Sequence, residues 1–161
     1  MTEQAEGSIK LQEFLNEVTK DELSHFPDVE TDGDKIATIW DNLYVCLGKS
    51  DENDNAEEVK KNKEKIREIN LARIIGIKAN RLKSVFEKGM LDEKLKKRLD
   101  RTFACTTIFM RIFEDPKERA RNLMFPQPAL HHKTPIEALM AGNVDRVLYF
   151  AAMSGRHHNL V

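Results

Sequence analysis

The chain has 161 residues, of which 40% are hydrophobic and 33% are charged, a composition typical of one globular domain or two small ones. It excludes a collagen-like chain and a wholly disordered one. The longest apolar run, residues 147–153, is far shorter than the roughly 20 residues that a membrane-spanning helix needs. The first ten residues lack the basic start and apolar stretch of a secretory signal. We therefore expect a cytoplasmic protein with no membrane partner.

The net charge of -1 conceals an uneven distribution along the chain. Residues 1–56 carry 14 Asp and Glu against 4 Lys and Arg, a net of -10, whereas residues 57–161 carry 13 against 22, a net of +9. Most of the positive excess lies in residues 58–101, with 15 basic and 7 acidic side chains. Such a basic segment indicates polyanion binding. Two oppositely charged, solvated helix faces that attract each other would give the same pattern.

Apolar spacing in the first third of the chain predicts two amphipathic helices. The first spans about 8–20, and its apolar face repeats at i, i+3, i+4 and i+7 through Leu11, Phe14, Leu15 and Val18. The second follows the turn and N-cap signals of residues 31–34 and ends at Gly48. Residues 49–57 contain one apolar side chain, an alanine, so we expect a flexible boundary there.

Residues 71–86 fit the spacing of a helix-turn-helix, in which two short helices cross at a steep angle. Ala72 is small where the helices would cross, and Gly76 permits the left-handed backbone of a tight turn. The apolar residues that would hold the two helices together are Ile75, Ile77, Leu82 and Val85. An ordinary pair of packed helices with a glycine turn would share these features.

The second helix of this unit would expose polar side chains to the major groove of DNA. The candidate DNA-binding residues are Lys78, Asn80, Arg81, Lys83 and Ser84. Arg81 and Asn80 are the expected base readers, because bidentate donors of these kinds suit guanine and adenine respectively.

Residues typical of helix starts and ends recur to the end of the chain, and no two segments have the pattern of paired strands. Asp115 and Pro116 predict the start of a short helix. Residues 134–137 (Thr-Pro-Ile-Glu) form a capping-box pattern for another helix, which stops at Gly142. A last helix, capped by Asn143, is expected to end at Gly155. Its apolar face comprises Val144, Val147, Leu148 and Ala151.

The order of these elements over residues 70–158 resembles the Xre/MbcA/ParS-type antitoxins. The helix-turn-helix is followed by Gly89-Met90-Leu91, Arg98-Leu99 and a long helix ending in Phe113-Glu114-Asp115-Pro116, similar to the family's linker helix. The more specific part is residues 125–139, FPQPALHHKTPIEAL, which looks like the family's Pro, small residue and Leu before a Thr-Pro-aliphatic-Glu helix start. This chain has His131-His132 where the family usually has two glycines.

The resemblance implies an antitoxin that binds a RES-domain toxin, an enzyme that consumes NAD, and that represses its own operon. It also implies that the C-terminal segment covers the toxin's NAD pocket. The corresponding residues here are Arg156, His157, His158, Asn159, Leu160 and Val161. Residues 1–56 match nothing in the family pattern.

No catalytic apparatus is predicted. No Ser, His and acid constellation, pair of carboxylates in an apolar pocket or glycine-rich cofactor motif can be argued from the sequence, so we expect a protein that is not an enzyme and holds no cofactor. The pairs at 131–132 and 157–158 predict no metal site, because adjacent histidines on regular structure diverge and neither cysteine has useful spacing to them. Cys46 and Cys105 are expected to be buried core residues.

The sequence therefore predicts an all-α protein in three parts: an acidic helical extension over 1–56, the helix-turn-helix region over 57–92, and the linker helix with the C-terminal module over 93–161. The leading interpretation is an antitoxin with a RES-domain toxin and operator DNA as partners. The alternative is a DNA-binding regulator without a toxin, and a pure scaffold stays open. Because repressors of short half-sites are usually dimeric, a homodimer or higher oligomer is expected.

Overall fold

The fold is all-α in the described part of this computed structural model, which covers residues 3–48, 56–88 and 91–157; within these ranges no strand occurs beyond one isolated bridge. The predicted fold class is therefore confirmed. The described α-helices are α1 (Glu3–Ser24), α2 (Asp32–Leu47), α3 (Ala56–Ile75), α4 (Leu82–Lys88), α5 (Glu93–Ile112), α6 (Pro116–Leu123), α7 (Pro135–Met140) and α8 (Val144–His157). Two short 3₁₀ helices, η1 (Ala79–Arg81) and η2 (Pro128–Leu130), precede α4 and α7.

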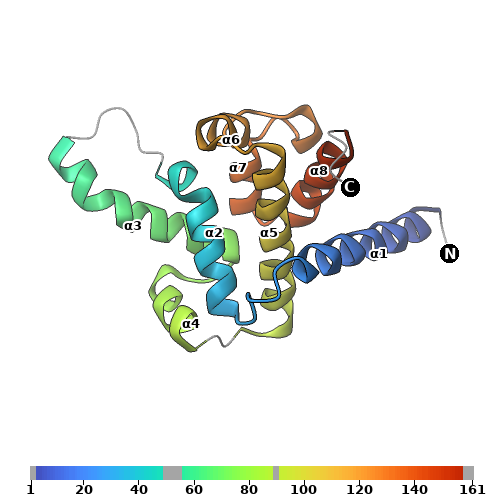
Figure 1. Ribbon diagram of the computed structural model, residues 1–161, viewed down its shortest axis with the longest axis horizontal. Helices are drawn as coiled ribbons and strands as arrows, with labels where there is room; N and C mark the ends of the chain where they lie inside the picture. Colours follow the sequence, from blue (N-terminus) through green and yellow to red (C-terminus); the bar gives the residue numbers. More distant parts are fainter. Residues whose placement is uncertain (1–2, 49–55, 89–90, 158–161) are drawn as a thin grey trace.

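Helix α5 forms the centre of the molecule, with α1, α2, α3 and α8 packed around it (Figure 1). Its residues 101–109 are buried on every side, as expected for a helix that lies inside a core. Three threonines are buried there, and their hydroxyls donate to carbonyls of α5 itself, those of Arg98, Phe103 and Ala104. These polar side chains are therefore satisfied within the helix.

Helix α1 is longer than the predicted 8–20 at both ends. Leu15 is fully buried, Phe14 and Val18 are partly buried, and Leu11 remains 39% exposed. Polar side chains of α1 bond to α5 at two levels. In the middle of α1 Gln12 accepts from Arg101. Near its C-terminal end, beyond the predicted boundary, the buried Glu22 accepts from Arg111 and Thr107.

Helix α2 begins as its capping signals predict. Thr31 is the N-cap: its hydroxyl accepts from the Asp34 amide at 3.0 Å, while the Asp34 carboxylate accepts from the Thr31 amide. Residues Asp32 to Asp34, predicted as part of the turn, already lie in the helix. Gly48 follows the last helical residue, as predicted. The boundary predicted over 49–57 lies mainly outside the described residues, although Ala56 and Glu57 belong to α3.

The C-terminal helices follow their predicted boundaries with one correction. Asp115 caps α6, with Pro116 in first position, and the Thr134 hydroxyl accepts from the Glu137 amide at 3.0 Å to cap α7. The predicted end of α8 at Gly155 is wrong, because the helix continues to His157. Gly155 is buried, so packing keeps its backbone helical despite the tendency of glycine to end helices.

The predicted apolar face of α8 is buried. Exposed fractions are 7% or less for Val144, Val147, Leu148 and Ala151. No helix in the described ranges is long and apolar enough to cross a bilayer.

Helix α4 packs on α2 through a close backbone approach. A Cβ atom added at Gly33 would lie 2.4 Å from the carbonyl oxygen of Phe86. We therefore expect Gly33→Ala to displace α4 and to lower the free energy of unfolding by about 1–3 kcal/mol in urea titrations followed by circular dichroism.

Gly7 provides the matched control for this substitution. It also lies in a helix, but an added Cβ there meets nothing within 4 Å, so Gly7→Ala should raise stability by up to about 1 kcal/mol through helix propensity. Equal stability of the two variants would contradict the packing of α4 against Gly33.

Candidate functional site

The turn between α3 and α4 has the backbone expected at its glycine. Gly76 has a φ of +94°, and the amides of Gly76 and Ile77 both donate to the Ala72 carbonyl, at 2.8 and 3.0 Å. Ala72 is 1% exposed, so its small side chain lies in the packed region, as predicted. Ile75 and Val85 are buried, and Ile77 and Leu82 are partly buried, but the predicted packing of the two helices on each other is not seen as stated, because α4 packs mainly on α2 rather than on α3.

The segment after this turn is less regular than a single recognition helix. Residues Ala79–Arg81 form η1, closed by the Arg81 amide donating to the Lys78 carbonyl at 2.9 Å, and α4 follows with seven residues. A 3₁₀ turn is common at the N-terminus of a helix. Helix α4 packs mainly on α2, so the first third of the chain supports this segment.

The predicted DNA-binding residues all lie on the exposed side of this segment. Each is exposed, and within the described ranges none makes a side-chain hydrogen bond or ion pair: Lys78, Asn80, Arg81, Lys83 and Ser84. Three of the five are basic. The arrangement presents free donors to solvent, as contact with a polyanion requires.

Arg98 fixes the turn from the side of α5, a role that sequence reasoning missed. Its Nε donates to the Ile74 carbonyl at 2.9 Å and its Nη2 to the Arg73 carbonyl at 2.7 Å, which satisfies carbonyls at the C-terminus of α3. A Cβ at Gly76 would lie 2.7 Å from Nη1 of Arg98. Burial lowers the pKa of Arg98 from its usual value, but the guanidinium stays charged at neutral pH.

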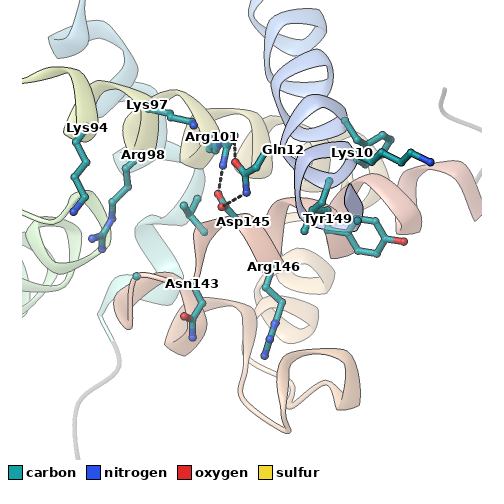
Figure 2. Close-up of a pocket in the computed structure, with 15 residues that line it drawn as sticks. Lys10, Gln12, Lys94, Lys97, Arg98, Arg101, Asn143, Asp145, Arg146 and Tyr149 are labelled. Carbon is teal, nitrogen blue, oxygen red and sulfur yellow. Dashed lines mark hydrogen bonds and ion pairs between the residues drawn. The ribbon is translucent and has the colours of Figure 1, made fainter. Parts of the chain in front are cut away.

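A second basic surface lies in a cleft of about 980 Å³ between α1, α5 and α8, which we term the basic cleft (Figure 2). Its cationic lining comprises Lys10, Lys94, Lys97, Arg98, Arg101 and Arg146. Four of these belong to the basic segment 58–101, so part of the positive charge seen in the sequence gathers here rather than on α4. Sequence reasoning missed this cleft, because its walls come from helices far apart in the chain.

Arg101 organises one wall of the basic cleft. It is 3% exposed, donates to the Asp145 carboxylate, and donates at 2.9 Å to the side-chain oxygens of both Gln12 and Asn16. Gln12 in turn donates to Asp145 at 3.2 Å. This cluster ties α1, α5 and α8 together and neutralises the acidic group of the cleft.

The loop that carries the two histidines has an unusual backbone. The Gln127 amide donates to the Lys133 carbonyl at 3.0 Å and the His132 amide to the Gln127 carbonyl at 2.9 Å, which closes residues 127–133 into a tight loop. His131 and His132 have φ values of +55° and +64°. This left-handed conformation is the one that glycine adopts most easily, and glycines are what the resemblance leads one to expect at these two positions.

The predicted toxin-binding segment is described only at its start. Arg156 is exposed, with its guanidinium 5.0 Å from the centre of the Phe14 ring, and His157 is the last residue of α8. His158, Asn159, Leu160 and Val161 lie outside the described residues.

The apolar face shared by α7 and α8 is internal. Leu139, Val147 and Leu148 are at most 1% exposed within this chain alone. This face is therefore covered in the folded chain and is not free to bind a toxin.

The two cysteines are buried free thiols, as predicted. Burial raises the pKa of Cys46 to about 11 and also raises the pKa of Cys105, so both are protonated and unreactive at neutral pH. In the described part of the chain, no group of three or more His, Cys, Asp or Glu side chains is arranged to hold a metal ion.

The left-handed backbone at residues 131–132 leads to a prediction about the free energy of unfolding. Replacing both histidines by glycine removes a left-handed penalty of about 1–2 kcal/mol per residue, offset in part by about 0.5–1 kcal/mol of extra chain entropy per glycine. We expect the free energy of unfolding of His131→Gly/His132→Gly to rise in chemical denaturation. His25→Gly is the control, because His25 has a negative φ and the substitution should be neutral or destabilising. A loss of stability in the double variant larger than that of the control would contradict the strained loop.

No protein-family model, curated protein or solved structure matches this chain. Similarity to known proteins therefore assigns it to no family. The likeness to the antitoxins rests on its residue pattern, and the function that follows from it is a proposal.

Proposed function

We propose that this chain is an antitoxin of the Xre/MbcA/ParS type, which neutralises a RES-domain, NAD-consuming toxin and represses its own operon. The observation that carries the proposal is the backbone of His131 and His132. Both residues adopt a glycine-like conformation where the antitoxin pattern has glycines, so the loop keeps the shape that the pattern implies although its side chains differ.

The surroundings of this loop support the same proposal. Before it, Leu130 of η2 is 2% exposed and anchors the Pro-small-Leu run in the core. After it, Thr134 caps α7 with Pro135 in the first helical position. A left-handed Gly142 then links α7 to α8. The pattern that prompted the resemblance therefore coincides with the residues that set the local backbone.

Because the apolar face of α8 is buried, it is not available to contact the toxin. Since Leu139, Val147 and Leu148 are covered, toxin contact falls to the end of the chain, residues 156–161, and to the exposed loop at 131–132. In this proposal the tail fills the toxin's NAD pocket and excludes the substrate sterically. The antitoxin acts by occlusion and performs no chemistry.

Deleting residues 156–161 tests this mechanism. We expect the truncated protein to lose the rescue of cells that express the cognate toxin, because the blocking segment is gone, while its helical circular dichroism signal is retained. The measurement is colony survival under joint expression, with soluble antitoxin quantified in parallel.

A single substitution tests how much the contact between Arg156 and Phe14 contributes to rescue. Arg156→Ala removes the contact with Phe14, worth about 0.5–1 kcal/mol at an exposed site, but leaves residues 157–161 in place, so it should weaken rescue less than the deletion. Full rescue by the deletion would refute neutralisation by the tail.

A second candidate, a DNA-binding regulator without a toxin, is favoured by the five exposed polar side chains of residues 78–84, at the start of η1, on η1 and on α4. Their exposure after the turn at Gly76 supports contact with the major groove. The same surface would serve autorepression by an antitoxin. DNA binding is therefore expected of both candidate functions. Only the antitoxin is expected to lower the rate at which a toxin consumes NAD.

Arg81→Ala tests major-groove reading by this surface. We expect the specific affinity for the chain's own promoter to fall by about 1–3 kcal/mol, with relaxed sequence preference, in fluorescence anisotropy titrations against specific and scrambled duplexes. Lys65→Ala removes an exposed charge from the body of α3 and should change both affinities little. Equal effects of the two substitutions would argue against base contact by Arg81.

A further inference from the structure

The basic cleft has a charge distribution that packing within the chain does not explain. Two of its six cations have structural partners: Arg98 binds the end of α3, and Arg101 binds Asp145. The other four are exposed, and within the described ranges none makes an ion pair or a side-chain hydrogen bond: Lys10, Lys94, Lys97 and Arg146. The cleft therefore presents four free positive charges.

These four charges come from three different helices. Lys10 lies on α1, Lys94 and Lys97 are one turn apart on α5, and Arg146 lies on α8 (Figure 2). The same side chains on one straight helix face would point into open solvent. Here they line a shared concavity, which raises the positive potential inside it.

The wall of the cleft formed by α1 differs in composition from the acidic segment to which this helix belongs. Helix α1 belongs to the acidic first third of the chain, yet from residue 7 onward, where its side chains are described, the residues it contributes to the cleft include no carboxylate: Gly7, Lys10, Leu11, Gln12 and Phe14. The acidic group on α8, Asp145, is held by the buried Arg101. The described side chains of α1 thus close the cleft without adding a negative charge to it.

The size and lining of the cleft fit a ligand larger than a single small anion. Ligand pockets commonly have volumes of about 300–1,000 Å³, and this one has about 980 Å³. Lysine ammonium groups and an arginine fork are the usual partners of phosphate oxygens. The ring of Tyr149, 45% exposed, offers an apolar surface at the same cleft for the organic part of a ligand.

We propose that the basic cleft between α1, α5 and α8 binds a ligand with several linked phosphate groups, the chemistry shared by free nucleotides and a nucleic-acid backbone. The inference does not depend on the toxin or on base reading by α4. Lys94, Lys97 and Arg146 bind the phosphates, and Arg98 and Arg101 keep the walls in place.

Titration calorimetry with sodium tripolyphosphate at constant ionic strength tests the proposal on the full-length protein. The test variant is Lys94→Gln/Lys97→Gln/Arg146→Gln. The control variant, Lys65→Gln/Lys117→Gln/Arg121→Gln, removes the same number and kind of exposed charges from α3 and α6, away from the cleft lining. Circular dichroism checks that both variants are folded.

We expect saturable binding of tripolyphosphate to the unaltered protein and to the control variant, and at least a tenfold weaker affinity in the cleft variant. A parallel titration of a short duplex DNA of scrambled sequence distinguishes the sources. If the ligand is a nucleic-acid backbone, the cleft variant loses duplex affinity and shows a shallower salt dependence; if it is a free nucleotide, duplex binding is unchanged.

Two results would overturn the proposal. One is the absence of saturable binding of both tripolyphosphate and duplex to the unaltered protein. The other is an equal loss of affinity in the cleft variant and the control variant, which would mean that net charge alone attracts the anion. Because Arg81 lies outside the cleft lining, failure of base reading at α4 would leave the tripolyphosphate result unchanged.

Discussion

The contact on which the arrangement of the functional surfaces depends is the seating of Arg98 between two turns. Its guanidinium caps the last carbonyls of α3 and packs against Gly76 and Gly142. Both glycines have a φ near +90°, and a side chain at Gly76 would collide with the guanidinium. One cation from α5 therefore fixes the turn before α4 and lies beside the loop before α8, where a Cβ on Gly142 would be 3.5 Å from it.

The uneven distribution of charge along the sequence can be followed into the folded protein. The first third of the chain is bound to the rest by Arg101, which donates to Gln12 and Asn16 in the middle of α1, and by Arg111, which pairs with the buried Glu22 near its end. Among the described residues, Glu22–Arg111 is the ion pair that joins an acidic group of the first third to a basic group of the rest, whereas Lys35–Asp100 has the opposite polarity. Groups of exposed cations with no partner among the described residues lie at η1 and α4 and in the basic cleft, and these are the surfaces to which functions are proposed.

Local features of the fold were predictable, and long-range ones were not. Apolar spacing and capping residues such as Thr31 and Asp115 predict helix starts because the causes lie within a few residues of each other. The attachment of α1 to α5 depends on contacts such as that between Gln12 and Arg101, 89 residues apart, which no local pattern contains. Histidine carries no signal for a left-handed backbone as strong as glycine does, so the loop at 131–132 was visible only through the resemblance.

The central claim is that this protein occludes the active site of an NAD-consuming toxin. The most direct measurement is the rate of NAD loss catalysed by the purified candidate toxin, with increasing amounts of this protein. The account predicts a stable complex and a rate that falls to background at a fixed ratio of antitoxin to toxin. An unchanged rate of NAD loss in the presence of excess protein would contradict it.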